Sequence, residues 1–165
     1  MTVTDIRKDP ERLTMTLTAE LAATVERSWQ LWADPRQLER WWGPPGFPAT
    51  FVKHDLTPGG QCSYYMSGPE GDTPWGWWEI LAAEAPHHLE LRDGFSGDDG
   101  EPNPDMPEMT MVLTIEPTGN GSRMTIVTSF PSAEVMAKLL EMGMEEGMLA
   151  AAGQIDDVLA GTTAG

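Results

Sequence analysis

Apolar and polar residues alternate in several short stretches of the chain, and this period of two is typical of a β-strand with one covered face. In the first stretch Leu13, Met15, Leu17 and Ala19 alternate with threonines. Further strand-like stretches, bounded mostly by Gly, Pro and Asn, lie at residues 50–56, 61–66, 75–82, 88–95, 109–115 and 124–130. These patterns predict about seven strands, with short turns that favour antiparallel neighbours.

Two short helices are predicted between the first strand and the second. Val25, Trp29 and Trp32 recur at helical spacing and indicate the first of them. The second begins at Asp34, a good N-cap residue, and Pro35 suits its first turn. One helix therefore follows directly on the other.

The second helix has a large apolar face. Leu38, Trp41 and Trp42 lie at positions i, i+3 and i+4, and Gly43 with the two prolines after it forces the helix to end. Two adjacent tryptophans carry too much apolar surface to remain in water. We therefore expect this helix to clamp onto the edge of the sheet.

A single long helix is predicted at the C-terminal end. It begins at Ser132, a plausible N-cap, and runs for about seven turns to Leu159. Its apolar face consists of Val135, Met136, Leu139, Leu140, Met144, Met148, Ala151, Ile155 and Val158.

The order of these elements predicts an α+β helix-grip fold. An antiparallel sheet of about seven strands curls, and the long C-terminal helix covers its concave face. The length of 165 residues suits one domain that spans residues 1–165. Residues 1–11 and 161–165 lack a pattern and are expected to be flexible.

Charge and composition exclude several classes of partner. The net charge is −16, from 26 acidic and 10 basic side chains, and no cluster of Lys or Arg occurs, which disfavours nucleic acid and anionic membrane surfaces. The single cysteine, Cys62, excludes an intrachain disulfide. Without a basic, apolar leader or a long apolar run, the chain is expected to be cytoplasmic, with no membrane partner.

Large rings on nearby elements face small residues on the terminal helix. The small residues are Gly143, Gly147, Ala150 and Ala151, and the rings are Trp41, Trp42, Tyr64, Trp75, Trp77, Trp78 and Phe95. Two interpretations are open: the rings interlock over the small residues as a solid core, or they enclose a cavity for a ligand.

Methionines add to this ambiguity, because their flexible thioethers either adapt to varied ligands or fill gaps in a ligand-free core. Eleven are present, several of them on the inward side of strands and helix. If a cavity exists, we expect it to be lined by Trp41, Trp42, Tyr64, Trp78, Phe95, Met109, Met111, Met136, Leu140, Met144, Gly147 and Met148.

Metal and cofactor motifs are missing from the sequence. His87 and His88 are neighbours at a strand start and point to opposite faces, and no C-x-x-C or H-x-x-x-H occurs, so we expect neither a metal nor a cofactor. The acidic residues within 96–107, Asp98 among them, indicate a mobile solvated loop and not a calcium loop.

Catalytic residues cannot be assigned from the sequence. Tyr64, Asp93, His54 and Glu79 are polar groups on predicted strands, and any that pointed into an apolar cavity would have a shifted pKa. Outward-facing, solvated positions are the favoured interpretation for these four.

Three segments carry a resemblance to a known family. They read D-P-R-Q-L-E-R-W-W-G-P-P-G-F from Asp34, D-L-T-P-G-G from Asp55 and G-P-E-G-D from Gly68. Over residues 13–159 the chain resembles the SRPBCC superfamily, in particular the branch like the C-terminal domain of the activator of the heat-shock ATPase. The branch usually has Gly-Trp in its terminal helix, where this chain has Gly147-Met148.

The resemblance implies a START-like fold with a cavity between sheet and helix, but not one activity. The leading hypothesis is a binding module for a small apolar or aromatic molecule. The alternatives are a polyketide cyclase-like enzyme that uses the same cavity, and an interaction protein that regulates a chaperone ATPase. The last is weakened because the chain has room for only one domain. The sequence does not decide between a monomer and a homodimer.

Overall fold

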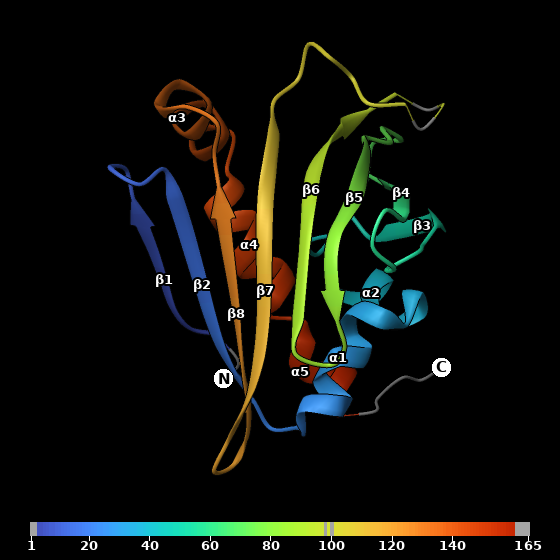
Figure 1. Cartoon of the computed structure of the whole chain (residues 1–165). Helices are drawn as coiled ribbons and strands as arrows, with labels where there is room; N and C mark the ends of the chain where they lie inside the picture. The colour runs from blue at the N-terminus through green and yellow to red at the C-terminus, as the bar shows by residue number, and fades with distance from the viewer. Residues whose placement is uncertain (1–2, 98, 100, 161–165) are drawn as a thin grey trace.

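An eight-stranded antiparallel sheet forms the frame of the molecule (Figure 1). The structure is a computed structural model, and it describes residues 3–97, 99 and 101–160. The strand order is β1-β2-β8-β7-β6-β5-β4-β3. The strands are β1 (Val3–Asp9), β2 (Thr14–Leu21), β3 (Ala49–Lys53), β4 (Gln61–Met66), β5 (Trp75–Glu84), β6 (His88–Ser96), β7 (Glu108–Thr118) and β8 (Gly121–Ser129).

Strand β1 corrects the expectation that residues 1–11 form a flexible arm. Val3–Asp9 pairs along β2 and adds an eighth strand to the predicted seven. Ile6 packs against the core, but its neighbours on β1 are largely polar. Backbone pairing at a sheet edge leaves little side-chain pattern, so the strand was not visible in the sequence. Residues 1–2 and 161–165 lie outside the described part of the chain.

The two helices after β2 form as predicted. Helix α1 (Val25–Ala33) is capped by Thr24, whose hydroxyl oxygen accepts a hydrogen bond from the Arg27 amide at 3.1 Å. Helix α2 (Pro35–Trp41) is capped by Asp34, which accepts from the Arg36 amide at 3.0 Å. Helix α2 lies beside β3, at the edge of the sheet (Figure 1).

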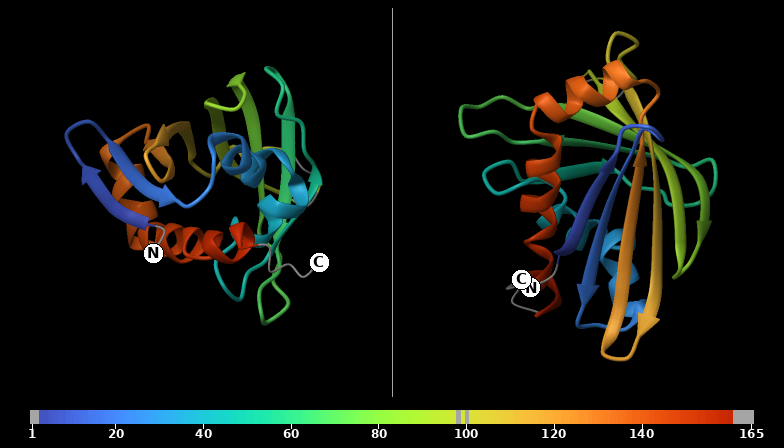
Figure 2. Two further views of the ribbon diagram at one scale, coloured as in Figure 1. Left: turned by 90° about the horizontal axis from the view of Figure 1, so that it is seen from below. Right: turned by 90° about the vertical axis from the view of Figure 1, so that its left-hand side faces the viewer.

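The terminal segment consists of three helices and not one. They are α3 (Ala133–Glu141), α4 (Met144–Ala152) and α5 (Ile155–Leu159). Ser132 caps α3 as predicted. The first break is at Gly143, whose φ of 93° is left-handed and cannot continue a right-handed helix. Figure 2 shows α3 at one end of the sheet, and α4 and α5 along its concave side.

The arrangement is the helix-grip fold, with its core between the concave face and these helices. The predicted phase of β2 is confirmed, because Met15 and Leu17 are each only 1% exposed. A cluster of aromatic rings joins α1 and α2 to β3, β4 and β5. It consists of Trp32, Trp41, Trp42, Phe51, Tyr64 and Trp78.

Two further expectations concern segments that the structure describes only in part. In the acidic segment 96–107, Ser96 forms an isolated bridge with Pro102, whereas Asp98 lies outside the described residues. The mobility of that segment stays a prediction. None of the helices in the described residues is long and apolar enough to span a bilayer.

Candidate ligand-binding site

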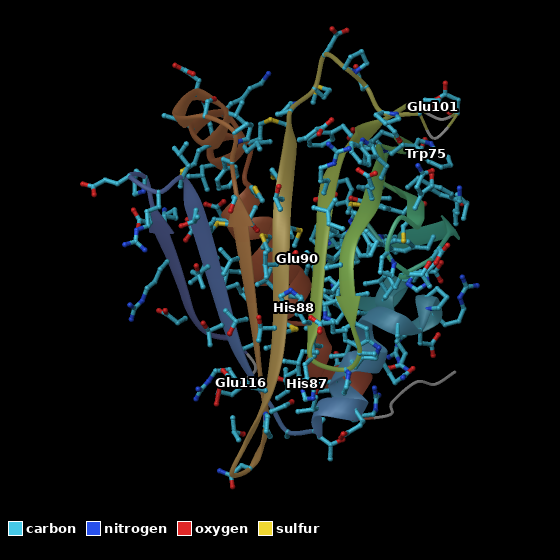
Figure 3. All side chains as sticks on the ribbon, viewed as in Figure 1. Trp75, His87, His88, Glu90, Glu101 and Glu116 are labelled. Carbon is cyan, nitrogen blue, oxygen red and sulfur yellow. The ribbon has the colours of Figure 1, made fainter. Side chains whose placement is uncertain are left out.

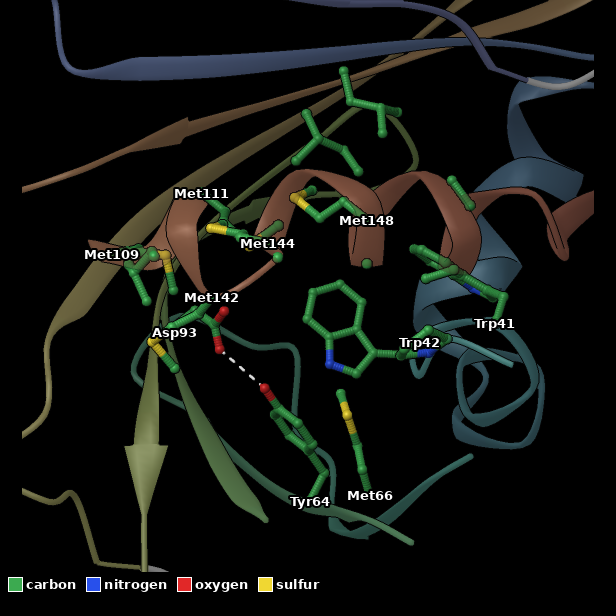
Figure 4. Close-up of a pocket in the computed structure, with 18 of the residues that line it drawn as sticks. Trp41, Trp42, Tyr64, Met66, Asp93, Met109, Met111, Met142, Met144 and Met148 are labelled. Carbon is green, nitrogen blue, oxygen red and sulfur yellow. Dashed lines mark hydrogen bonds between the residues drawn. The ribbon is translucent and has the colours of Figure 1, made fainter. Parts of the chain in front are cut away.

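A cavity of about 350 Å³ lies between the concave face of the sheet and the terminal helices (Figure 4). Its floor comes from β2, β4, β6, β7 and β8, its roof from the end of α3, the break at Gly143 and α4, and one side from the end of α2. Met142 lines the cavity but is 59% exposed, so it lies at the rim.

The structure brings nine of the twelve predicted site residues to this cavity: Trp41, Trp42, Tyr64, Phe95, Met109, Met111, Met144, Gly147 and Met148. Gly147 leaves space at the roof, because a Cβ built on it would meet no atom within 4 Å. Whether these nine residues contact a ligand stays a prediction.

Three predicted residues do not line the cavity. Trp78 is fully buried behind Trp42, with their ring centroids 4.9 Å apart, and belongs to the solid core. Met136 and Leu140 are on α3, which contributes Leu139 to the cavity lining, but these two side chains border a separate hollow next to Leu13. Both pack instead in a cluster that includes Met15 and Met109 of the sheet, whereas one continuous helix was expected to place them at the cavity.

The predicted group of rings is also divided between the two faces of the sheet. Trp75 packs on Tyr65 with centroids 4.9 Å apart, and Trp77 lies under the Arg92 guanidinium at 5.8 Å. Trp75 and Trp77 share one face of β5, and Trp78 points to the other, inward face because successive side chains of a strand alternate. The other face therefore takes two of the seven rings that we expected to surround a core or a cavity.

A buried carboxyl lies in the wall of the cavity. Asp93 is on β6 and is 8% exposed, and the Tyr64 hydroxyl donates a hydrogen bond to its Oδ1 at 3.1 Å. Burial raises the pKa of Asp93 to about 7, although donors from Tyr64 and Trp78 favour the ionised form. Burial and the neighbouring Asp93 charge raise the pKa of Tyr64 well above its usual value.

Indole N–H groups surround this pair. Those of Trp42 and Trp78 are near enough to favour negative charge on the Tyr64 or Asp93 oxygens, yet neither makes a hydrogen bond of normal geometry. Figure 4 shows the nitrogen-bearing edge of Trp42 turned toward Tyr64 and Asp93. Trp41 differs, because its Nε1 donates to the Leu31 carbonyl at 2.9 Å.

Asp93 is the site residue that the sequence analysis missed, because polar strand residues were expected to face solvent. A signal was present: Asp93 continues the inward series of Leu89 and Leu91 along β6. The other polar candidates are elsewhere. His54 Nε2 lies 2.9 Å from the Trp32 carbonyl oxygen, and Glu79 pairs with Arg92 on the opposite face.

Other chemistry-bearing groups are dispersed. His88 Nε2 lies 3.5 Å from Glu90 Oε1 on the face turned away from the terminal helices (Figure 3), whereas His87 Nδ1 lies 3.3 Å from the Ile115 carbonyl oxygen. Cys62 is buried, which raises the pKa of its thiol to about 11 and keeps it unreactive. The described residues contain no group of three potential metal ligands.

Gln154 connects the roof of the cavity to the double-tryptophan segment. Its side-chain amide, between α4 and α5, donates to the Gly43 carbonyl at 2.7 Å. On the other side of α2, the Arg27 guanidinium donates to Gln37 and to the Val158 carbonyl, at 2.6 and 3.1 Å. These contacts fix α2 and α5 relative to each other and so define one side of the cavity.

Known structures with high similarity cover nearly the whole chain. Protein Ms6760 from Mycobacterium smegmatis is 48% identical over 99% of this chain and 98% of its own, with a TM-score of 0.87. A protein from Arthrobacter aurescens is 49% identical over 98% of this chain and 94% of its own, with a TM-score of 0.93. A protein from Staphylococcus epidermidis, 23% identical with a TM-score of 0.84 over 98% and 97% of the two chains, shares the fold.

A search of curated proteins gave no match. The family model described as activator of Hsp90 ATPase homolog 1-like protein matches residues 22–160, which confirms the resemblance noted in the sequence. The chain therefore belongs to the family of activator of Hsp90 ATPase homolog 1-like proteins.

Proposed function

We propose that this protein binds a small apolar or aromatic molecule in the cavity between its sheet and its terminal helices. The observation that carries the proposal is the cavity of about 350 Å³ and its largely apolar lining. Its volume falls within the range of roughly 300–1,000 Å³ that is typical of small-molecule sites. A ligand-free core would be expected to close such a space, because protein interiors contain few voids larger than a water molecule.

The distribution of large and small side chains supports this interpretation. Methionines on α4 and β7 give the walls adaptable surfaces, whereas Gly147, Ala151 and Ala152 keep the roof thin. An aromatic ligand would bury its faces against Trp42 and the thioethers, and burial of apolar area would drive its binding.

The test is a thermal-shift panel of apolar aromatic compounds on the parent protein and on Gly147→Leu. We expect the parent protein to melt at a higher temperature when ligand is present, because a ligand that binds only the folded state stabilises it. At a ligand concentration of 100 Kd this stabilisation is about 2.7 kcal/mol. Gly147→Leu should reduce the shift because its side chain enters the cavity. Ala150 was expected to face the rings, but it is exposed and does not line the cavity. Ala150→Leu should therefore leave the shift unchanged.

Equal shifts in all three proteins, or no shift with any compound, would contradict the proposal. Native mass spectrometry of freshly purified protein adds an independent measurement. It would show a retained small molecule as extra mass and would count the subunits, which decides between monomer and homodimer.

A second candidate function is acid–base catalysis on the bound molecule, as in a polyketide cyclase-like enzyme. The observation that favours it is the buried Asp93, whose pKa of about 7 suits proton transfer near neutral pH. Turnover would appear as a chemical change in the recovered ligand, and Asp93→Asn would then bind the molecule without converting it.

Regulation of a chaperone ATPase is the third candidate, and it is suggested by the description of the matched family. Its test is the ATPase rate of a heat-shock ATPase with and without this protein. A rate that rises with protein concentration and is insensitive to cavity ligands would favour this function over ligand binding.

A further inference from the structure

The Asp93 carboxyl has no cationic partner among the residues that line the cavity. That lining includes no Lys, Arg or His, and Asp93 and Tyr64 are its only titratable residues. The adjacent Arg92 lies on the opposite face of the sheet, where it pairs with Glu79 and Glu108. A buried carboxyl is normally either protonated or paired with a cation, so a partner that holds Asp93 in its ionised form would come from outside this wall.

Burial favours the protonated form of Asp93, whereas the hydrogen-bond donors around it favour the ionised form. The Tyr64 hydroxyl donates to it, and the Trp78 indole N–H and the Gly94 amide also act in that direction. The residues opposite Asp93 on the neighbouring strands, Trp78 on β5 and Met109 on β7, carry no charge. The site therefore offers donors to a carboxylate and provides nothing to neutralise it.

We infer that the cavity takes a monocationic amine with an aromatic or apolar body, whose ammonium group pairs with the Asp93 carboxylate. This inference rests on the proposed function and names the chemical class of its ligand. The hydrocarbon body occupies the part of the cavity that is lined by methionines, next to the Trp42 ring.

Other ligand classes fit the wall less well. A carboxylic acid would bring a second negative charge against Asp93, and a purely apolar molecule would leave the carboxylate desolvated and unpaired. A neutral alcohol would donate one hydrogen bond but would leave the charge uncompensated. The net charge of −16 also raises the local concentration of cations around the molecule and steers them toward it.

The experiment compares three molecules of the same shape: 2-naphthylmethylamine, 2-naphthylmethanol and 2-methylnaphthalene. Their affinities are measured at about pH 8, where Asp93 is ionised and the amine is protonated. We expect the amine to bind about tenfold or more tightly than the alcohol, because only the ammonium group compensates the buried negative charge of Asp93.

Two variants with the same change in charge locate the effect. Asp93→Asn removes the carboxylate from the cavity and should abolish the preference for the amine. Glu90→Gln removes a carboxylate from the same strand on the opposite face and should keep the preference. A pH comparison on the parent protein covers the case in which Asp93→Asn does not fold. Between about pH 5.5 and pH 8 the affinity for the amine should rise and that for 2-methylnaphthalene should fall.

Each alternative result has a definite meaning. Equal affinities for the amine and the alcohol would overturn the assignment of an amine but leave ligand binding intact. An equal loss of preference in both variants would show general attraction to an acidic protein and would also overturn it. If none of the three molecules binds, the proposed function itself fails.

Discussion

At the scale of single residues, the Asp93 carboxyl couples the stability of the ligand-free protein to pH. Its pKa is about 7 in the fold, against 3.8 for an exposed aspartate. The folded state therefore holds the proton more tightly than the unfolded state. Stability from this group is fully present below about pH 4 and is lost as the pH rises to about 7.

Asp93→Asn removes this dependence. Because each unit of pKa shift corresponds to about 1.4 kcal/mol, the stability of the variant relative to the parent should rise by up to roughly 4 kcal/mol between about pH 4 and pH 8. Urea unfolding of both proteins across this range measures the difference and cancels the other titrating groups. Parallel curves for the two proteins would show that Asp93 keeps an ordinary pKa.

The residues of the site were predictable where the strand period alone decides their direction. Met109, Met111 and Phe95 were placed correctly in the wall because alternation fixes the face. Asp93 obeys the same period, but its polarity was taken as a sign of solvent. A buried polar group violates the pattern that reveals burial, so sequence reasoning misses such residues most easily where they have a function.

At the scale of elements, the break at Gly143 decides which part of the terminal segment covers the cavity. Only glycine adopts its φ of 93° at low cost, and Gly147, four residues later, lies within α4 with open space at its Cβ position. The two glycines therefore form a matched pair. Gly143→Ala should destabilise the protein by about 1–2 kcal/mol, whereas Gly147→Ala should stabilise it by up to about 1 kcal/mol.

Thermal or urea unfolding of the two variants measures both signs. If Gly143→Ala were as stable as Gly147→Ala, residues 133–152 could form one continuous helix and the break would be unnecessary. The sequence did contain Gly143, but the apolar series continues across it, and that series was taken as one helix. A helix period reports which side is buried and does not report whether the axis bends.

At the scale of the whole molecule, the curved sheet, the order of elements and the family were predictable, because they depend on many residues that agree with one another. The sheet edge was not predictable, since β1 is held by backbone pairing to β2. The sequence did not decide between a cavity and a solid core for a related reason. A cavity exists only if the side chains of the sheet and those of the terminal helices leave space between them. No local sequence pattern indicates that distance.

The net charge is the property of the whole chain that leads to the last prediction. Ion pairs such as Arg123–Glu20, at 2.8 Å, lie on the surface and contribute little, whereas 26 acidic and 10 basic side chains give a long-range repulsion that folding increases. Raising NaCl from about 0.01 M to 0.15 M shortens the Debye length from about 30 Å to 8 Å. The urea midpoint should therefore rise with salt, and equally in KCl, because screening depends on ionic strength. A midpoint that falls with salt would show instead that surface ion pairs outweigh the repulsion between the acidic side chains.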